Sequence, residues 1–306
     1  MSTPSFKTWL VAARPRTLLL AVANIGMGIF LAFSDQRGDF AVGFFCLLTA
    51  ILLQILSNLA NDYGDSRHGA DSSSSGRLGP KRAVQSGLIS SVQMRNAVGV
   101  LASLAVLSGI TLVGLAFGLE RLLLSLLFIA LGGAAIWAAI AYTATQNPYG
   151  YAGLGDLMVF IFFGLVAVLG TYYLQAKTLG WDLLLPATAS GLFSVAVLNV
   201  NNIRDLESDK RAGKYSIPVR IGPRNAKLYH VALLLVGTLA ALGYVAINYA
   251  NPWQFLFLLS LPLLAINGAR VWQGKNPAAL DPLLKQMSIS TLVFTLLFGI
   301  GLSLGG

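Results

Sequence analysis

Long apolar runs repeat along almost the whole chain and limit what it can fold into. Most are close to the length of about 20 residues that a helix needs to cross hydrocarbon about 30 Å thick. Charged residues make up only 11% of the sequence, far fewer than a soluble domain carries. We therefore predict an all-α, multi-pass membrane protein with nine transmembrane helices, near residues 17–33, 40–61, 94–117, 122–142, 157–176, 183–201, 227–248, 254–272 and 286–304.

The basic residues predict the orientation of these helices. With the N-terminus in the cytoplasm, every Lys and Arg falls on the cytoplasmic side except Arg37, Arg121 and Lys177. This is the positive-inside pattern, and it explains the net charge of +9 without a nucleic-acid partner. Cys46 is the one cysteine, which excludes a disulfide framework and a Cys-based metal site.

The connections between the runs indicate a single membrane-embedded domain over residues 1–306. The two longest connections, about 62–93 and 202–226, are both expected on the cytoplasmic side. Connections of that length in a tight helical bundle usually form lids or binding loops. We expect these two to be cytoplasmic cap loops.

Two acidic segments, at residues 58–71 and 201–210, each end an apolar run and together hold half of the 12 acidic residues. Polar residues recur in them every four positions, which on a helix places them on one face. Carboxylate and amide oxygens are ligands that suit Mg²⁺, which fills its remaining positions with water and phosphate. The two segments therefore predict one Mg²⁺ site, with Asn61, Asp62, Asp65, Asn201, Asp205 and Asp209 as ligands and Asn58 and Asp71 as auxiliary residues.

Basic residues follow both acidic segments. A diphosphate bound through Mg²⁺ needs fixed positive charge nearby, which these residues would supply. The alternative for each of them is contact with lipid headgroups. The residues predicted to bind diphosphate are Lys81, Arg82, Arg204, Lys210 and Lys214.

A third connection, residues 147–156, contains several glycines and two tyrosines and almost no charge. Glycine permits close approach of the backbone, and aromatic rings can stack on a flat substrate. We predict an aromatic-acceptor pocket that includes Tyr142, Tyr149 and Tyr151. The alternative for each ring is the aromatic belt of the membrane interface.

At these residues the chain resembles the UbiA superfamily of intramembrane prenyltransferases. Asn61-Asp62-x-x-Asp65 and Asp205-x-x-x-Asp209 are similar to its two aspartate-rich motifs. Gly69 stands where many members carry another Asp, so that either Asp71 takes that duty or the first motif has fewer ligands. The branch that prenylates 1,4-dihydroxy-2-naphthoate in menaquinone synthesis is the most similar, through residues 58–65, 148–156, 171–175, 198–205 and 213–214.

The resemblance implies a nine-helix bundle around a central cavity that opens sideways to lipid under the two cap loops. It also implies Mg²⁺-dependent transfer of a polyprenyl group from polyprenyl diphosphate to 1,4-dihydroxy-2-naphthoate, with loss of CO₂, giving demethylmenaquinol. The implied location is the bacterial cytoplasmic (inner) membrane, with the active site facing the cytoplasm and no required protein partner. The residues expected to carry catalysis are Asp65, Asp205, Asp209 and Lys214.

Three other functions fit parts of the pattern. A relative that transfers a phytyl group to the same acceptor would share every motif. An ion-coupled secondary transporter would also hold acidic residues within the membrane, but near its midplane on broken helices. A CDP-alcohol phosphotransferase would resemble one continuous Asp-rich motif with an Arg inside it, which this sequence lacks.

Overall fold

The computed structural model describes residues 4–67, 82–118, 120–274 and 276–304. Within these residues, nine helical segments are long and apolar enough to cross a membrane, which confirms the predicted all-α, multi-pass class. They are Pro15–Ser34, Phe40–Arg67, Ser91–Phe117, Leu122–Ala141, Gly155–Ala176, Trp181–Arg204, Ile217–Ile247, Pro252–Gln273 and Pro277–Ser303.

Several spans combine more than one type of helix. The elements in chain order are α1 (Phe6–Ala12), α2 (Pro15–Ser34), α3 (Phe40–Arg67), α4 (Ser91–Phe117), α5 (Leu122–Ala141), α6 (Gly155–Val159), η2 (Phe160–Leu169), α7 (Gly170–Ala176), η3 (Trp181–Leu183), α8 (Leu184–Arg204), α9 (Leu206–Arg211), α10 (Ile217–Ile247), η4 (Pro252–Ser260), α11 (Leu261–Gln273), η5 (Pro277–Leu280) and α12 (Asp281–Ser303).

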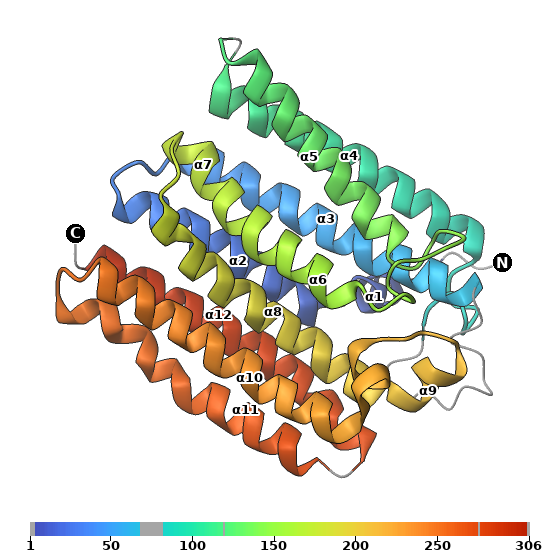
Figure 1. Cartoon of the computed structure of the whole chain (residues 1–306). Helices are drawn as coiled ribbons and strands as arrows, with labels where there is room; N and C mark the ends of the chain where they lie inside the picture. Colours follow the sequence, from blue (N-terminus) through green and yellow to red (C-terminus); the bar gives the residue numbers. More distant parts are fainter. Residues whose placement is uncertain (1–3, 68–81, 119, 275, 305–306) are drawn as a thin grey trace.

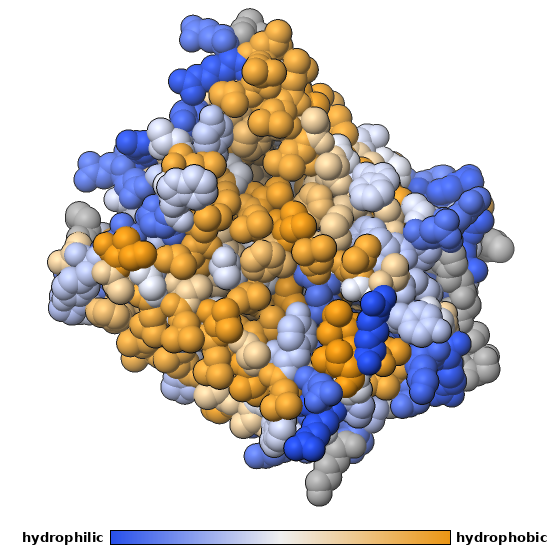
Figure 2. All heavy atoms as spheres, in the orientation of Figure 1, coloured by the Kyte–Doolittle hydropathy of each residue, from blue (hydrophilic) through white to orange (hydrophobic). Residues whose placement is uncertain are grey.

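The spans run side by side, and the two termini lie at opposite ends of the bundle (Figure 1). The N-terminus lies at the same end as α9, the short helix that follows the second acidic segment. Figure 2 shows a broad apolar surface between polar groups that gather toward the two ends. This is the distribution that a bilayer requires of a protein that crosses it.

Helix α8 lies at the centre of the larger group of helices, whereas α5 lies at the edge of the bundle. Within the apolar 18-residue stretch of each span, 72% of the span that contains α8 is buried inside the protein, compared with 6% of α5. Phe193 of α8 packs edge-on against Phe294 of α12 at 4.9 Å, and Phe257 and Phe298 surround the same ring. The α4–α5 pair lies to one side of this core (Figure 1).

Two glycines allow α8 to approach η2, which is a π-helical stretch. A Cβ atom at Gly164 would lie 2.8 Å from the Cα atom of Gly191 and 2.8 Å from the carbonyl oxygen of Ala187. Small residues at such a contact let helices in a membrane pack backbone to backbone. This contact fixes the position of η2, which forms one wall of the cavity described below.

The two acidic segments differ in their helical structure. Helix α3 continues to Arg67, beyond the predicted end at residue 61, so the first segment is helical through Asp65. Helix α8 ends at Arg204, and α9 begins at Leu206. The helix is interrupted at Asp205 alone, and the N–H groups of Asp205 and Asp209 still donate to the carbonyls of Asn201 at 3.0 Å and Asp205 at 2.8 Å. The predicted shared face of these three residues stays a prediction.

The second predicted cap loop, residues 202–226, is mostly helical. It contains α9 and the beginning of α10, whose helix is interrupted at Gly222, with φ 81°, just before Pro223. Proline has no N–H to donate, and a left-handed conformation favours glycine, which explains the bend. In the first cap loop, helix α4 begins with a capping box between Ser90 and Gln93.

Candidate functional site

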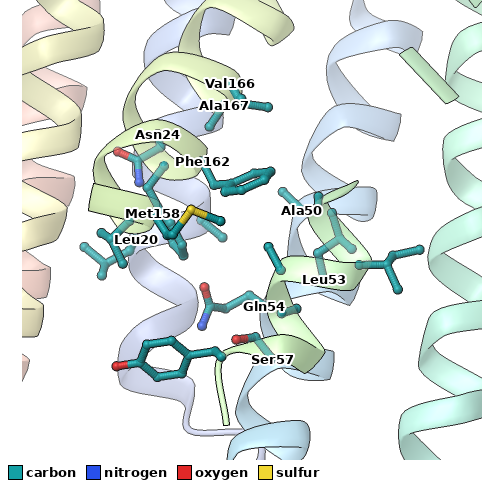
Figure 3. Close-up of a pocket in the computed structure, with 18 of the residues that line it drawn as sticks. Leu20, Asn24, Ala50, Leu53, Gln54, Ser57, Met158, Phe162, Val166 and Ala167 are labelled. Carbon is teal, nitrogen blue, oxygen red and sulfur yellow. The ribbon is translucent and has the colours of Figure 1, made fainter. Parts of the chain in front are cut away.

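A cavity of about 520 Å³ lies between α2, α3, α4, α5, α6, η2, α7 and α8. Figure 3 shows part of its apolar wall, formed by Leu20 of α2, Ala50 and Leu53 of α3, and Met158 and Phe162 of α6 and η2. Its other end is polar. The charged residues and the asparagines that line that end come from the residue before α2, both acidic segments and both cap loops, and they are Arg14, Asn58, Asn61, Asp65, Arg82, Asn201, Asp209 and Lys214.

The cavity also reaches the outer surface of the bundle. Val106 and Ile110 of α4 and Ile129 of α5 line the cavity and are 46%, 52% and 45% exposed. Gly132 and Gly133 line it as well, and a Cβ atom at either would meet no other atom within 4 Å. The apolar part of the cavity is therefore in contact with the lipid-facing surface of α4 and α5.

The first acidic segment presents Asp65 to the polar end of the cavity. Arg82, which lies within the first cap loop, forms a buried ion pair with Asp65. The hydroxyl of Tyr151 donates a hydrogen bond to the other carboxylate oxygen at 3.2 Å. The ion pair and the hydrogen bond replace the water that this carboxylate loses on burial.

Asp62 has different partners from Asp65. Its carboxylate accepts hydrogen bonds from the backbone N–H groups of Ala83 at 2.9 Å and Val84 at 3.2 Å. It therefore ties the end of the first cap loop to α3, and it is not among the residues that line the cavity. Its predicted role as a metal ligand stays a prediction.

The two asparagines of the first segment also connect elements. Asn58 donates to the carbonyl of Ala13 at 2.8 Å and to the hydroxyl of Thr17 at 2.9 Å, which ties α3 to the junction between α1 and α2. The side-chain oxygen of Asn61 accepts from the hydroxyl of Thr143 at 3.0 Å. Both asparagines line the cavity.

In the second segment, Arg204 binds the residue that follows it. Its Nε and Nη2 atoms donate to the two carboxylate oxygens of Asp205 at 2.8 and 2.7 Å, and Nη2 also donates to Asn201 at 2.8 Å. Its Nη1 atom donates to Asp281 at 2.5 Å. Neither Arg204 nor Asp205 is among the residues that line the cavity.

Asp209 and Lys214 form the other charged pair of this segment. The Lys214 Nζ atom lies 3.4 Å from Asp209, and the Lys214 backbone N–H donates to the Asp209 carbonyl at 2.9 Å. Burial lowers the pKa of the Lys214 ammonium, but Asp209 and the other acidic groups around it together outweigh burial, so the pKa lies above its usual range. Lys214 is therefore positively charged at neutral pH.

The donor set at the polar end fits a hard divalent cation. Carboxylate and amide oxygens from Asn61, Asp65, Asn201 and Asp209 line one cavity end, and Mg²⁺ prefers such oxygens. In the part of the chain that the structure describes, no three acidic, His or Cys side chains converge as a ready cage. A cation with few protein ligands and with phosphate in its remaining positions, as is usual for Mg²⁺, suits this arrangement.

The third predicted segment is packed against the cavity through Tyr149. Tyr149 and Tyr142 both line the cavity, and their rings meet edge-on at 5.4 Å. The Tyr149 ring also stacks on Trp137 at 6.3 Å, and its hydroxyl donates to the Ala138 carbonyl at 2.8 Å. Burial raises the pKa of both tyrosines, so that both keep their protons at neutral pH.

The same segment is attached to the second cap. Gly153 has φ +76°, and a Cβ atom there would lie 2.4 Å from the Tyr215 carbonyl oxygen. The Tyr215 N–H donates to the Tyr151 carbonyl at 2.9 Å, and Arg220 donates to the Ala152 carbonyl at 2.7 Å. The segment at 147–156 and the cap therefore form one connected surface over the polar end.

The other predicted site residues are placed less closely around the cavity. Tyr151 and Lys210 are not among its lining residues, and Lys210 is exposed. Asp71 and Lys81 lie outside the described residues, as does Gly69.

Several polar residues that line the cavity or contact its motifs lie outside the predicted site. Asn24, Gln54 and Ser194 line the cavity from within apolar runs, and an isolated polar residue in such a run is a signal for a functional position. Asp281, which contacts Arg204, is the only acidic residue after Asp209 in the sequence, and that isolation could have drawn attention to it.

The fold and the site define a multi-pass membrane protein whose cavity has one charged end and an apolar remainder. The profile of the UbiA prenyltransferase family matches residues 18–300, and the chain belongs to this family. The chain is 43% identical over 307 residues to 1,4-dihydroxy-2-naphthoate octaprenyltransferase of Haemophilus influenzae, covering 100% of this chain and 98% of that protein. It is 44% identical over 299 residues to the enzyme of the same name in Escherichia coli, covering 97% and 96%.

More distant matches include an enzyme with a different donor and a solved structure. The 2-carboxy-1,4-naphthoquinone phytyltransferase of Synechocystis is 29% identical over 262 residues, covering 84% of this chain and 80% of that protein. A UbiA homologue from Archaeoglobus fulgidus bound to GPP and Mg²⁺ superimposes with a TM-score of 0.66 at 16% identity, covering 97% of this chain and 99% of that chain. The last match supports the fold, which is the predicted nine-helix bundle of the family.

Proposed function

We propose that this protein transfers a polyprenyl group from polyprenyl diphosphate to 1,4-dihydroxy-2-naphthoate, with loss of CO₂, giving demethylmenaquinol for menaquinone synthesis. The observation that carries the proposal is the division of the cavity into a charged end and an apolar remainder. A prenyl diphosphate has the same division, with a charged head and a hydrocarbon tail. The named relatives with 43% and 44% identity support the naphthoate as acceptor.

The charged pairs suggest how the chain receives a diphosphate with its metal. Asp65 is paired with Arg82, and Asp209 with Lys214. A cation bound by the carboxylates would release Arg82 and Lys214 to bind the diphosphate, so the exchange leaves no charge unpaired. Bound Mg²⁺ would stabilise negative charge on the departing diphosphate. The A. fulgidus homologue, which has the same fold, is bound to GPP and Mg²⁺, and this is consistent with a site for a diphosphate and its metal.

The acceptor half of the site is assigned to Tyr142 and Tyr149. Both rings line the cavity next to its charged end, and aromatic faces favour stacking on a flat naphthoate and attract a nearby cation. The apolar wall in Figure 3 would keep water from an allylic cation formed when diphosphate leaves. These residues therefore bind and orient the acceptor and exclude water.

The proposed location is the bacterial cytoplasmic membrane, with the charged end of the cavity facing the cytoplasm. The positive-inside distribution of Lys and Arg supports this orientation. Single cysteines placed at exposed Lys210 and at Lys177, on a Cys46→Ser background, would test it in intact cells. A membrane-impermeant maleimide should label position 177 and leave position 210 unlabelled, and the reverse result would contradict the proposed orientation.

The reaction is tested with protein purified in detergent, 1,4-dihydroxy-2-naphthoate, Mg²⁺ and a panel of prenyl diphosphates, with detection of products by mass. We expect prenylated product that has lost the mass of CO₂. Preference for phytyl diphosphate would instead favour the alternative named in the Synechocystis relative. The transporter alternative is not supported, because the acidic residues lie at the end of α3 and around the α8–α9 junction and the chain belongs to a prenyltransferase family.

A further inference from the structure

Asp281 contacts the second acidic segment from a distant part of the sequence. It is the first residue of α12, and its Oδ1 atom accepts from Arg204 Nη1 at 2.5 Å. Arg16, at the beginning of α2, donates to the same carboxylate at 3.2 and 3.5 Å. A chain of charges therefore runs from Arg16 through Asp281 and Arg204 to Asp205.

Arg204 uses two different edges of its guanidinium in this chain. The Nε and Nη2 edge binds Asp205, while Nη1 binds Asp281. The Arg204 and Asp205 side chains are 1% and 3% exposed, whereas the Asp281 side chain is 37% exposed. One buried cation is thus shared between a buried carboxylate and a partly exposed one.

The sharing of Arg204 between Asp205 and Asp281 becomes important when Asp205 is needed to bind the metal. With both oxygens on Arg204, Asp205 is not among the residues that line the cavity. If Asp205 turns to a cation in the cavity, the buried guanidinium loses two charge-assisted hydrogen bonds. A buried charge without a partner is strongly unfavourable, so a second carboxylate on the other edge lowers the cost of the exchange.

We propose that Asp281 is a positioning residue for the second acidic motif, which retains Arg204 when Asp205 turns toward Mg²⁺ and diphosphate. The proposal rests on the proposed function and adds a residue that lies outside both motifs. Removing the Asp281 carboxylate leaves Asp205 as the stronger remaining partner of Arg204. The affinity of the site for the cation should then fall.

A capping role for Asp281 predicts a different result. An acidic residue in the first turn of a helix interacts favourably with the helix dipole, and its loss would lower stability. It would not by itself change the affinity for a cation at another segment. Metal affinity therefore separates the two roles, and thermal stability does not.

The test measures binding of Mn²⁺, in place of Mg²⁺, to the full chain in detergent with inorganic diphosphate. The EPR signal of free Mn²⁺ reports the dissociation constant without any need for turnover. For Asp281→Asn we expect this constant to rise by about 10-fold, the size of a typical coupling between sites. Asp281→Glu, which keeps the charge, should restore most of the affinity.

A control variant separates retention of Arg204 from a general loss of negative charge. Glu207→Gln removes one charge from an exposed position on α9, close to the same motif. We expect its dissociation constant to stay within a small factor of the wild-type value. An equal rise in Glu207→Gln and Asp281→Asn, or no rise in Asp281→Asn, would overturn the proposal.

Two other results are possible: Asp281→Asn could fail to fold, and the wild type could fail to bind Mn²⁺. If Asp281→Asn does not fold, as judged by gel filtration and thermal unfolding, Asp281→Ser removes the same charge with another residue that favours helix starts. The same rise is expected from it, and an unchanged constant would again overturn the proposal. Failure of the wild type to bind Mn²⁺ with diphosphate would overturn the proposed function itself, which distinguishes the two failures.

Discussion

The two acidic motifs have similar sequence spacing and different geometry. The first lies on an unbroken helix, and Asp65 faces the cavity in a pair with Arg82, which lies 17 residues further along the chain. The second crosses the end of α8, and Asp205 pairs with its neighbour Arg204 while Asp209 faces the cavity. In the second motif, the acid that Arg204 does not hold is therefore the one that lines the cavity.

Because of this difference, the two acidic motifs have different tasks in the proposed reaction. Asp65 faces the cavity already and has only to exchange Arg82 for a cation. Asp205 has to turn before it can do the same, and Arg204 has to be retained elsewhere. If the two motifs act as one site despite this difference, loss of the metal or of an acid from either motif should stop the reaction.

The largest effect is expected from removing the metal, since both acidic motifs are proposed to bind it. EDTA should abolish turnover of prenyl diphosphate, and added Mg²⁺ should restore it. The product assay by mass measures this directly, with the EDTA-treated protein dialysed into Mg²⁺-free buffer as the reference. Undiminished turnover in excess EDTA would show that the reaction needs no divalent cation.

Removing single acidic residues tests each of the two motifs in turn. Asp65→Ala, Asp205→Ala and Asp209→Ala should each lower kcat by about 100-fold or more, comparable to deleting a main electrostatic stabiliser. Gel filtration checks that each variant still folds in detergent. Wild-type activity in any two of them would contradict a shared site.

The two lysines of the second cap offer a matched pair. Lys214 lines the cavity beside Asp209, whereas Lys210 is exposed. Lys214→Gln should raise the KM for prenyl diphosphate by roughly 10-fold, because a charge-assisted hydrogen bond contributes about 1.5–3 kcal/mol. Lys210→Gln should change it less. A change in the naphthoate KM alone would contradict the assignment of Lys214 to the diphosphate.

Tyr149 tests the acceptor half, which neither acidic motif explains. Tyr149→Ala should weaken use of dihydroxynaphthoate by about 10-fold, from losing roughly 1.4 kcal/mol of stacking, with an unchanged Mg²⁺ requirement. Tyr149→Phe keeps the ring and should retain most of the activity. Kinetics with one substrate varied at a time measure this, and a wild-type acceptor KM and kcat in Tyr149→Ala would place the acceptor elsewhere.

Substitution of Tyr151 should give the smallest effect, and it tests the first acidic motif separately from the second. Its hydroxyl donates to Asp65, although the sequence predicts an acceptor contact for its ring. Tyr151→Phe removes only that hydrogen bond, worth about 1 kcal/mol, and should raise the Mg²⁺ requirement by roughly 5-fold. Tyr151→Ala also removes the ring, so a further loss of acceptor use in that variant alone would support the acceptor contact.

The fold was predictable because length and hydropathy determine a membrane helix. The site was predictable where charge is rare, since Asp65 and Asp209 are conspicuous at the ends of apolar runs. The partners of these acids were not predictable. Arg82 and Asp281 reach the motifs through tertiary packing, which the four-residue spacing does not reveal.

The small buried fraction of α5 has a consequence for the medium in which the protein works. Because α5 packs against α3 and α4 but is buried over only 6% of its apolar stretch, a bilayer would form its outer face and so influence the cavity wall on that side. Hydrocarbon thickness and lateral pressure act on such a helix through its tilt, at a modest energetic cost. The α4–α5 pair could yield to a bulky hydrocarbon tail while the phenylalanine cluster around α8 stays packed, so the choice of lipid or detergent becomes an experimental variable of the enzyme itself.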